Sequence, residues 1–117
     1  MNYENLCQNI IDFDSKIRFC GITNTKSEIV ASINRDSEDK MLKDDEIQMS
    51  IHYTLDRWSK ATNLSYRIGN EKSATIEYDK VTLITIPISG SELLLISTEP
   101  NAEYAKIIEY ATKQLKE

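Results

Sequence analysis

Few side chains in this sequence are of the types that perform catalysis, and their spacing argues against it. His52 is the only histidine, so a Ser-His-Asp relay or a zinc site would have to be built around one imidazole on a helix surface. Cys20 is a candidate nucleophile, but its predicted strand, beside Phe19 and Gly21, offers no activating base. We therefore expect His52 to be a surface residue and Cys20 to be a packing residue.

Metal and phosphate sites are not indicated either. Cys7 and Cys20 fall in a predicted helix and a predicted strand without CxxC spacing, so we expect both thiols to be reduced and packed. The acidic residues between positions 36 and 46 lack the alternating spacing and central glycine of a calcium loop and predict a solvated connection. Gly69 and Gly90 are isolated, which is not typical of a phosphate loop. We expect no catalytic residue, no metal and no cofactor.

Composition sets the outer bounds. The 117 residues are 40% hydrophobic, which suits one packed domain spanning residues 1–117. With 14 basic against 19 acidic side chains and a net charge of −5, attraction to nucleic acid or to anionic membranes is not expected. No apolar run approaches the roughly 20 residues needed to cross a bilayer, and residues 1–13 do not resemble a signal peptide. We expect a soluble, cytoplasmic protein.

The first third of the chain predicts a helix followed by a hairpin. Residues 2–14 carry apolar side chains at three- and four-residue spacing, with Asn2 as a cap. The stripe comprises Tyr3, Leu6, Cys7, Ile10, Ile11 and Phe13. Residues 16–23 and 28–34 are short and rich in branched side chains, and the polar stretch 24–27 separates them. This pattern is typical of an antiparallel hairpin.

A long helix is predicted to start near Asp44 and to carry two apolar sides. When each residue is rotated by about 100° from the one before it, the apolar side chains fall on a core face and on a second, roughly opposite stripe. The core face comprises Ile47, Ile51, Leu55, Trp58 and Ala61, and the second stripe comprises Leu42, Met49, Tyr53 and Leu64. The helix ends either near Thr62 or, as we favour, at Ile68 before a left-handed cap at Gly69. A second apolar stripe indicates a helix covered on two sides.

Three strands and a closing helix follow. Residues 74–79 alternate, so we expect an edge strand with one buried face. The next strand spans 81–88, with Pro87 at a strand end, bulge or edge position. The run 93–96 is apolar on both faces and should be the centre of the core. Pro100 and Asn101 are predicted to open the last helix, whose apolar stripe comprises Tyr104, Ile107, Ile108, Ala111 and Leu115.

The fold class predicted from this order is α+β. We expect a five-stranded antiparallel sheet with the long middle helix on one face and the two terminal helices on the other. The stretch from Glu77 to Leu115, with its Asp79-Lys80 turn, its strands ending IPISG and LLLIS and its helix entry EPNA, resembles archaeal and bacterial proteins of the Roadblock family, the dynein light-chain type. The hairpin strands IRFCGIT and IVAS resemble the same family. The sequence departs from it in the charged connection 37–46 and in a first turn without glycine. Profilin-like and PAS-type folds have similar mixtures of elements.

The resemblance implies a noncatalytic platform that dimerises through its middle helices and the edge strands after them, and that serves small GTPases or larger assemblies. For this chain we expect Leu42, Met49, Tyr53 and Leu64 to contact a second copy. We expect the strand that carries Ile76 and Tyr78 to pair edge to edge with its twofold mate. The plain alternative is that these are scattered surface apolar residues.

A second function remains open from the sequence. Six tyrosines and Trp58 could line the internal cavity of a small-ligand sensory domain, although Trp58 and Tyr104 already have places on core stripes. An enzyme ranks third, because no pair of groups is spaced for acid, base or nucleophilic catalysis.

Overall fold

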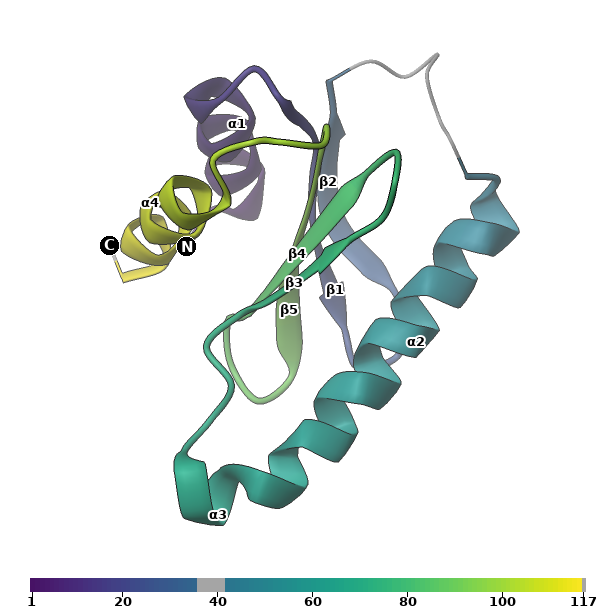
Figure 1. Cartoon of the computed structure of the whole chain (residues 1–117), viewed down its shortest axis with the longest axis vertical. Helices are drawn as coiled ribbons and strands as arrows, with labels where there is room; N and C mark the ends of the chain where they lie inside the picture. The colour runs from purple at the N-terminus through teal and green to yellow at the C-terminus, as the bar shows by residue number, and fades with distance from the viewer. Residues whose placement is uncertain (36–41, 117) are drawn as a thin grey trace.

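The computed structural model describes residues 1–35 and 42–116 (Figure 1). Its elements are α1 (Tyr3–Phe13), β1 (Ile17–Asn24), β2 (Ile29–Asn34), α2 (Asp44–Ala61), the 3-10 helix η1 (Thr62–Leu64), α3 (Ser65–Ile68), β3 (Ala74–Glu77), β4 (Thr82–Pro87), β5 (Glu92–Thr98) and α4 (Tyr104–Lys116). The strands form one antiparallel sheet in the order β2-β1-β5-β4-β3. Helices α1 and α4 lie on one side of the sheet and α2 on the other (Figure 1). The predicted fold class is confirmed.

The core lies between the sheet and the terminal helices. In the β4–β5 register Ile84 is opposite Ile96, and Ile86 is opposite Leu94. These side chains are buried together with Ile10 of α1 and residues of α4. Because side chains alternate along a strand, the residues between them point to the α2 side. On that side Leu83 and Leu95 are only half-buried, so the two faces of the sheet are buried to different degrees.

Helix α1 follows the predicted pattern, with one correction. The side chain of Asn2 accepts a hydrogen bond from the backbone N–H of Asn5 (3.1 Å), so the cap is confirmed. Leu6, Cys7, Ile10 and Ile11 are buried. Phe13, expected in the buried stripe, is 41% exposed. It lies at the last residue of the helix, where its ring stacks on that of Tyr110 with centroids 4.1 Å apart.

The β1–β2 hairpin turns without glycine. Oδ1 of Asn24 accepts hydrogen bonds from the backbone N–H groups of Lys26 (2.9 Å) and Glu28 (3.1 Å). Ser27 has φ 65°, a left-handed conformation that usually favours glycine. The side chain of Asn24 thus adds two hydrogen bonds to the backbone bonds that close the turn, among them the N–H of Ser27 to the carbonyl of Asn24 (3.2 Å).

The helical path after α2 continues to Ile68, as favoured from the sequence, but it is not one helix. The 3-10 segment η1 interrupts it, where the hydroxyls of Thr62 and Ser65 donate to the carbonyls of Ser59 (2.6 Å) and Thr62 (2.8 Å). Such side-chain bonds compete with the regular helical ladder. Gly69 follows with φ 85° and ψ 178°, and its N–H donates to the carbonyl of Ser65 (2.9 Å). The helical path therefore ends at the predicted glycine, in a positive-φ conformation that favours glycine but is not the predicted left-handed cap.

Helix α4 begins at Tyr104, later than predicted. Asn101 has φ 66°, which is incompatible with a right-handed helix, so Pro100 and Asn101 form a turn ahead of it. The stripe itself is confirmed: Ile107 and Ala111 are buried, and Tyr104, Ile108 and Leu115 pack against the core.

Strands β3 to β5 occupy the predicted places. Strand β5 is central in the sheet, with Leu93, Leu94 and Ile96 almost fully buried, and Pro87 ends β4. Strand β3 lies at an edge, but its expected buried face was wrong, because Ile76 is 38% exposed and only Ala74 is partly covered.

No helix in the described ranges has the length and apolarity to span a membrane.

Candidate interaction surface

Helix α2 begins where its acidic first turn predicts. The backbone N–H of Lys43 donates to Oε1 of Glu46 (2.9 Å), half of a capping box. Asp44, Asp45 and Glu46 place negative charge in the first turn, at the positive end of the helix dipole. From this start, α2 runs along the side of the sheet opposite to α1 and α4 (Figure 1).

The inner side of α2 is less deeply covered than predicted. Of the predicted core face, only Ile51 is buried, at 4% exposed, while Ile47, Leu55, Trp58 and Ala61 are half-buried. The sheet residues on this side, including Leu83 and Leu95, are also half-buried. One helix is too narrow to cover a face of five strands, so apolar surface remains on both elements.

An ion pair fixes α2 relative to the chain that leads into β3. Nη1 and Nη2 of Arg57 donate to the two carboxylate oxygens of Glu71, at 2.7 and 3.0 Å. Nη2 also lies 3.5 Å from Oγ1 of Thr85 on β4. The hydrogen bonds that Arg57 donates to Glu71 raise the pKa of Arg57. This bidentate geometry sets direction as well as distance.

The outward side of α2 presents Met49 and Tyr53, one turn apart and 51% and 67% exposed. Leu42 and Leu64, expected on the same stripe, are exposed too but do not extend it. Leu42 precedes the helix, and Leu64 lies in η1, where a 3-10 helix advances about 120° per residue instead of 100°. The helical rotation on which their alignment was predicted therefore applies to neither.

Strand β3 supplies the second part of the predicted surface. Ile76 pairs in register with Leu83, so it points to the α2 side of the sheet. Tyr78, 57% exposed, lies just beyond the strand, and its N–H donates to the carbonyl of Val81 (2.8 Å). Among the described residues β3 pairs with β4 alone, so its outer edge is open. The helix residues and Ile76 therefore lie on one side of the molecule.

Sequence reasoning missed two exposed apolar side chains that follow α2. Tyr66 is 80% exposed and Ile68 is 78% exposed, both on α3. In a continuous helix Leu64 and Ile68 would share one face and Tyr66 would lie roughly opposite, so apolar side chains on two faces were the available signal. The sequence analysis used this stretch only to place the end of the helix.

The candidate catalytic residues lie apart from one another. His52 is exposed, with Nδ1 3.4 Å from Oγ of Ser27. Cys20 is fully buried against Cys7, and the hydrogen bond between the thiols, together with burial, raises the pKa of Cys20 far above its usual range. Both cysteines are free, as predicted. Within residues 1–35 and 42–116, no group of His, Cys, Asp and Glu could hold a metal ion.

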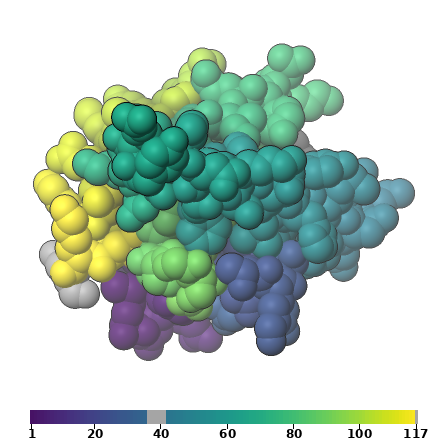
Figure 2. Space-filling view, turned by 90° about the horizontal axis from the view of Figure 1, so that it is seen from below, coloured from purple at the N-terminus to yellow at the C-terminus, as the bar shows by residue number. Residues whose placement is uncertain are grey.

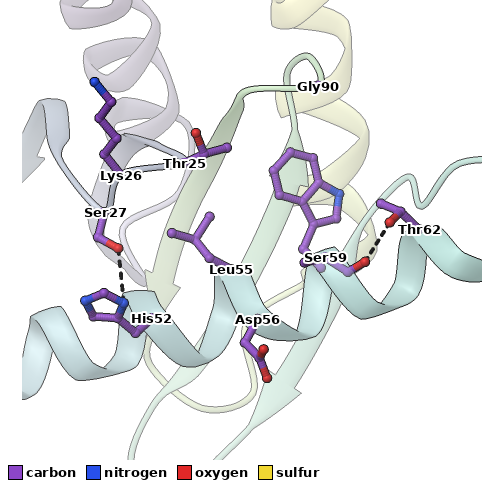
Figure 3. Close-up of a pocket in the computed structure, with 10 residues that line it drawn as sticks. Thr25, Lys26, Ser27, His52, Leu55, Asp56, Ser59, Thr62 and Gly90 are labelled. Carbon is purple, nitrogen blue, oxygen red and sulfur yellow. Dashed lines mark hydrogen bonds between the residues drawn. The ribbon is translucent and has the colours of Figure 1, made fainter.

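A hollow of about 570 Å³ lies along α2 (Figure 3). The β1–β2 turn at Thr25–Ser27, residues of α2 and Gly90 in the β4–β5 turn line it. It is open to solvent, unlike the enclosed cavity that the sensory-domain alternative predicts.

Comparison with solved structures identifies the fold. A Roadblock/LC7 domain from Streptomyces avermitilis matches with a TM-score of 0.76 at 11% identity, over 99% of this chain and 93% of that one. The chain has the Roadblock/LC7 fold. An MglB with a tetrameric arrangement matches at 0.76 and 9% identity, over 96% and 81% of the two chains. The gliding protein MglB from Thermus thermophilus matches at 0.74 and 10% identity, over 97% and 82%. No protein-family model and no curated protein matches this Roadblock-fold chain in sequence.

Proposed function

We propose that this protein is a noncatalytic, dimeric interaction platform that acts as a regulator or scaffold subunit for a small GTPase. The observation that carries the proposal is the coincidence, on one side of the molecule, of exposed apolar residues on α2 with an open edge strand, β3. Met49 and Tyr53 supply the helix surface, and Ile76 supplies the strand surface.

A second copy is the occupant that fits both features. An unpaired strand edge can be satisfied by another strand, and a twofold axis would place β3 against its own mate. The same axis would bring two α2 helices together over the half-buried sheet residues Leu83 and Leu95. Each copy would cover the apolar surface that the other leaves exposed, with Leu42, Leu64 and Tyr78 at the borders.

The small GTPase is proposed as the partner because the chain resembles Roadblock proteins. The Roadblock fold is shared with MglB, for which a tetrameric arrangement is recorded, and self-association is therefore compatible with this architecture. A small GTPase partner follows from the resemblance of the sequence to the Roadblock family. In this proposal any nucleotide hydrolysis belongs to the partner, and the present chain supplies surface and geometry.

Light scattering over a range of concentrations tests the dimer. The wild type should have twice the monomer mass, and Tyr53→Asp should shift it to the monomer, because a carboxylate would be buried at the interface. Val30→Asp is the matched control, since Val30 is 48% exposed on the opposite edge strand β2 and should leave the mass unchanged. A wild-type monomer at all concentrations, or an unaltered mass for Tyr53→Asp, would remove the proposal. The GTPase role is tested separately, by co-purification of the tagged wild type from its native cells.

A further inference from the structure

The outward stripe of α2 carries charges as well as apolar side chains. At about 100° per residue, five exposed residues of the helix fall within about 80° of one another. They are Glu46, Met49, Tyr53, Asp56 and Lys60. Figure 2 shows the teal α2 as a band across one face of the molecule, between the blue β1–β2 turn and the green β3–β4 turn. A partner on this stripe would therefore meet charges of both signs.

The charges are arranged symmetrically about Tyr53. Glu46 and Lys60 are equally far from Tyr53 in sequence, so each lies about two helical turns, or about 10 Å, from it and on nearly the same side. A twofold interface uses the same surface on both partners, so residue i contacts j and j contacts i. Opposite charges at equal distances from the centre make the stripe complementary to itself. This pattern favours a second copy of the chain as the occupant.

The proposed dimer fixes the direction of the two helices. Helix α2 lies on one side of the sheet (Figure 1). Two copies joined through β3 have both α2 helices on the same side only if the twofold axis is perpendicular to the sheet. Rotation about that axis reverses directions within the sheet plane, so the helices run antiparallel. The acidic first turn of each helix, which includes Glu46, then lies toward the last turn of its mate, which carries Lys60.

Two registers of an antiparallel pair bring the exposed apolar residues together. With Tyr53 opposite Tyr53 of the second copy, Glu46 lies opposite Lys60 of that copy. With Met49 opposite Tyr53 of the second copy, Glu46 lies opposite Asp56 instead. Like charges that face each other oppose association and exclude competing arrangements. The charges on α2 therefore select the register that is centred on Tyr53.

The contacts of these charges within one copy are compatible with this pairing. Oε1 of Glu46 accepts a hydrogen bond from the backbone N–H of Lys43 (2.9 Å), and the side chain remains exposed. Lys60 pairs with Asp56 (3.0 Å), but these side chains are 75% and 63% exposed, and such pairs contribute little by themselves. Lys60 can therefore lie between Asp56 of its own helix and Glu46 of the second copy.

We propose that two copies of this chain associate through antiparallel α2 helices in a register centred on Tyr53, in which Glu46 of each copy pairs with Lys60 of the other. The inference rests on the proposed dimer and deepens it, because it assigns the register of the interface and makes association dependent on ionic strength.

Exchange of the two charges tests the pairing. Glu46→Lys and Lys60→Glu should each raise the dimer dissociation constant about fivefold or more, because each variant places like charges opposite one another at two points of the dimer. The double variant with both substitutions should return to within about twofold of the wild type, since the pairs are restored with their signs exchanged. Sedimentation equilibrium measures all three constants.

Asp44→Lys is the matched control. It makes the same charge change in the same helical turn as Glu46→Lys, at an exposed position on the side of α2 opposite to Tyr53. We expect it to raise the dissociation constant by less than about twofold, because it lies off the stripe. Unchanged circular dichroism shows that each variant is folded.

Ionic strength supplies a second measurement. An increase from about 0.05 M to about 0.5 M salt should weaken the wild-type dimer and narrow the gap between it and the two single variants, because screening shortens the range of exposed charges. The double variant should follow the wild type at each salt concentration. A wild-type dissociation constant that does not change with salt would overturn the pairing.

The outcomes separate the register from the dimer. If the wild type is dimeric but Glu46→Lys tightens association, Glu46 faces Asp56 and the register is wrong. If the double variant is no tighter than the weaker single variant, or if Asp44→Lys weakens association as much as Glu46→Lys, the two charges do not face each other. Each of these results overturns the register and leaves the proposed dimer intact. A wild-type monomer at all concentrations overturns both.

Discussion

Both terminal nitrogens of Arg57 donate to the carboxylate of Glu71, and this contact joins the C-terminal part of α2 to the chain three residues before β3. The side chain of Glu71 is only 16% exposed, against 35% for Arg57. The pair therefore fixes the angle between the helix and the edge strand that together form the proposed dimer surface.

Removal of this ion pair should destabilise the fold measurably. We expect Glu71→Ala to lower the free energy of unfolding by about 1–2 kcal/mol, because two charge-assisted hydrogen bonds are lost from a partly buried site. Lys60→Ala is the control: its pair with Asp56 is 75% and 63% exposed and should contribute at most about 0.5 kcal/mol. Urea unfolding followed by circular dichroism measures both. Equal losses would show that the Arg57 pair is no more than a surface contact.

Alkaline unfolding should report the contact between Tyr3 and Glu92. The Tyr3 hydroxyl donates to Oε1 of Glu92 (2.5 Å), and this hydrogen bond raises the pKa of Tyr3 above 10.0. The folded state thus favours the neutral phenol. The contribution of this hydrogen bond to the free energy of unfolding is fully present below the pKa of Tyr3 in the unfolded chain. It is lost as the pH rises through the raised pKa of Tyr3 in the folded state.

Tyr3→Phe should therefore be less stable than the wild type at pH 7, by about 1 kcal/mol, and the difference should shrink above pH ~10. Tyr66→Phe, at an 80% exposed position, is the control and should follow the wild type at every pH. Thermal unfolding from neutral to strongly alkaline pH supplies the comparison. A constant gap between Tyr3→Phe and the wild type would contradict the assigned contact.

The hairpin turn should depend on one amide side chain. Asn24→Ala removes the acceptor for two backbone N–H groups, those of Lys26 and Glu28, and should cost about 1–2 kcal/mol of unfolding free energy. Asn63→Ala, at an exposed position in η1, should change it by less than about 0.5 kcal/mol. Chemical denaturation compares them. If Asn24→Ala matches Asn63→Ala, the strands hold the turn without its help.

The order of the elements could be predicted because it rests on local patterns. Apolar periodicity located α1, α2 and α4, and branched runs located the strands, because each element buries one side of itself. The start of α4 was missed for a reason that is also local: Asn101 adopts a left-handed conformation, which asparagine tolerates but which no hydrophobic pattern encodes.

The surface could be predicted only in part. Met49 and Tyr53 lie one turn apart, so rotation within a single helix was sufficient to place them together. Leu42 and Leu64 were misaligned because the helix begins after one and changes to 3-10 geometry at the other. Hydroxyls such as that of Thr62 decide that change. Relations between elements, such as Arg57 with Glu71, depend on tertiary packing and leave no sequence period.

Ile76→Lys distinguishes an interface on β3 from a merely exposed strand. Ile76 points to the α2 side of the sheet, and a lysine there would place a positive charge on each copy beside its twofold mate. We expect the dimer dissociation constant to rise at least tenfold, measured by sedimentation equilibrium, because inward charges at strand edges oppose pairing. Thr75→Lys is the matched control, since Thr75 is exposed on the same strand and points to the opposite face. It should weaken the dimer far less. If the two lysines weaken association equally, only the edge pairing is disturbed, and the side of β3 that faces α2 is not buried between copies. If neither lysine weakens association, β3 is not part of the interface.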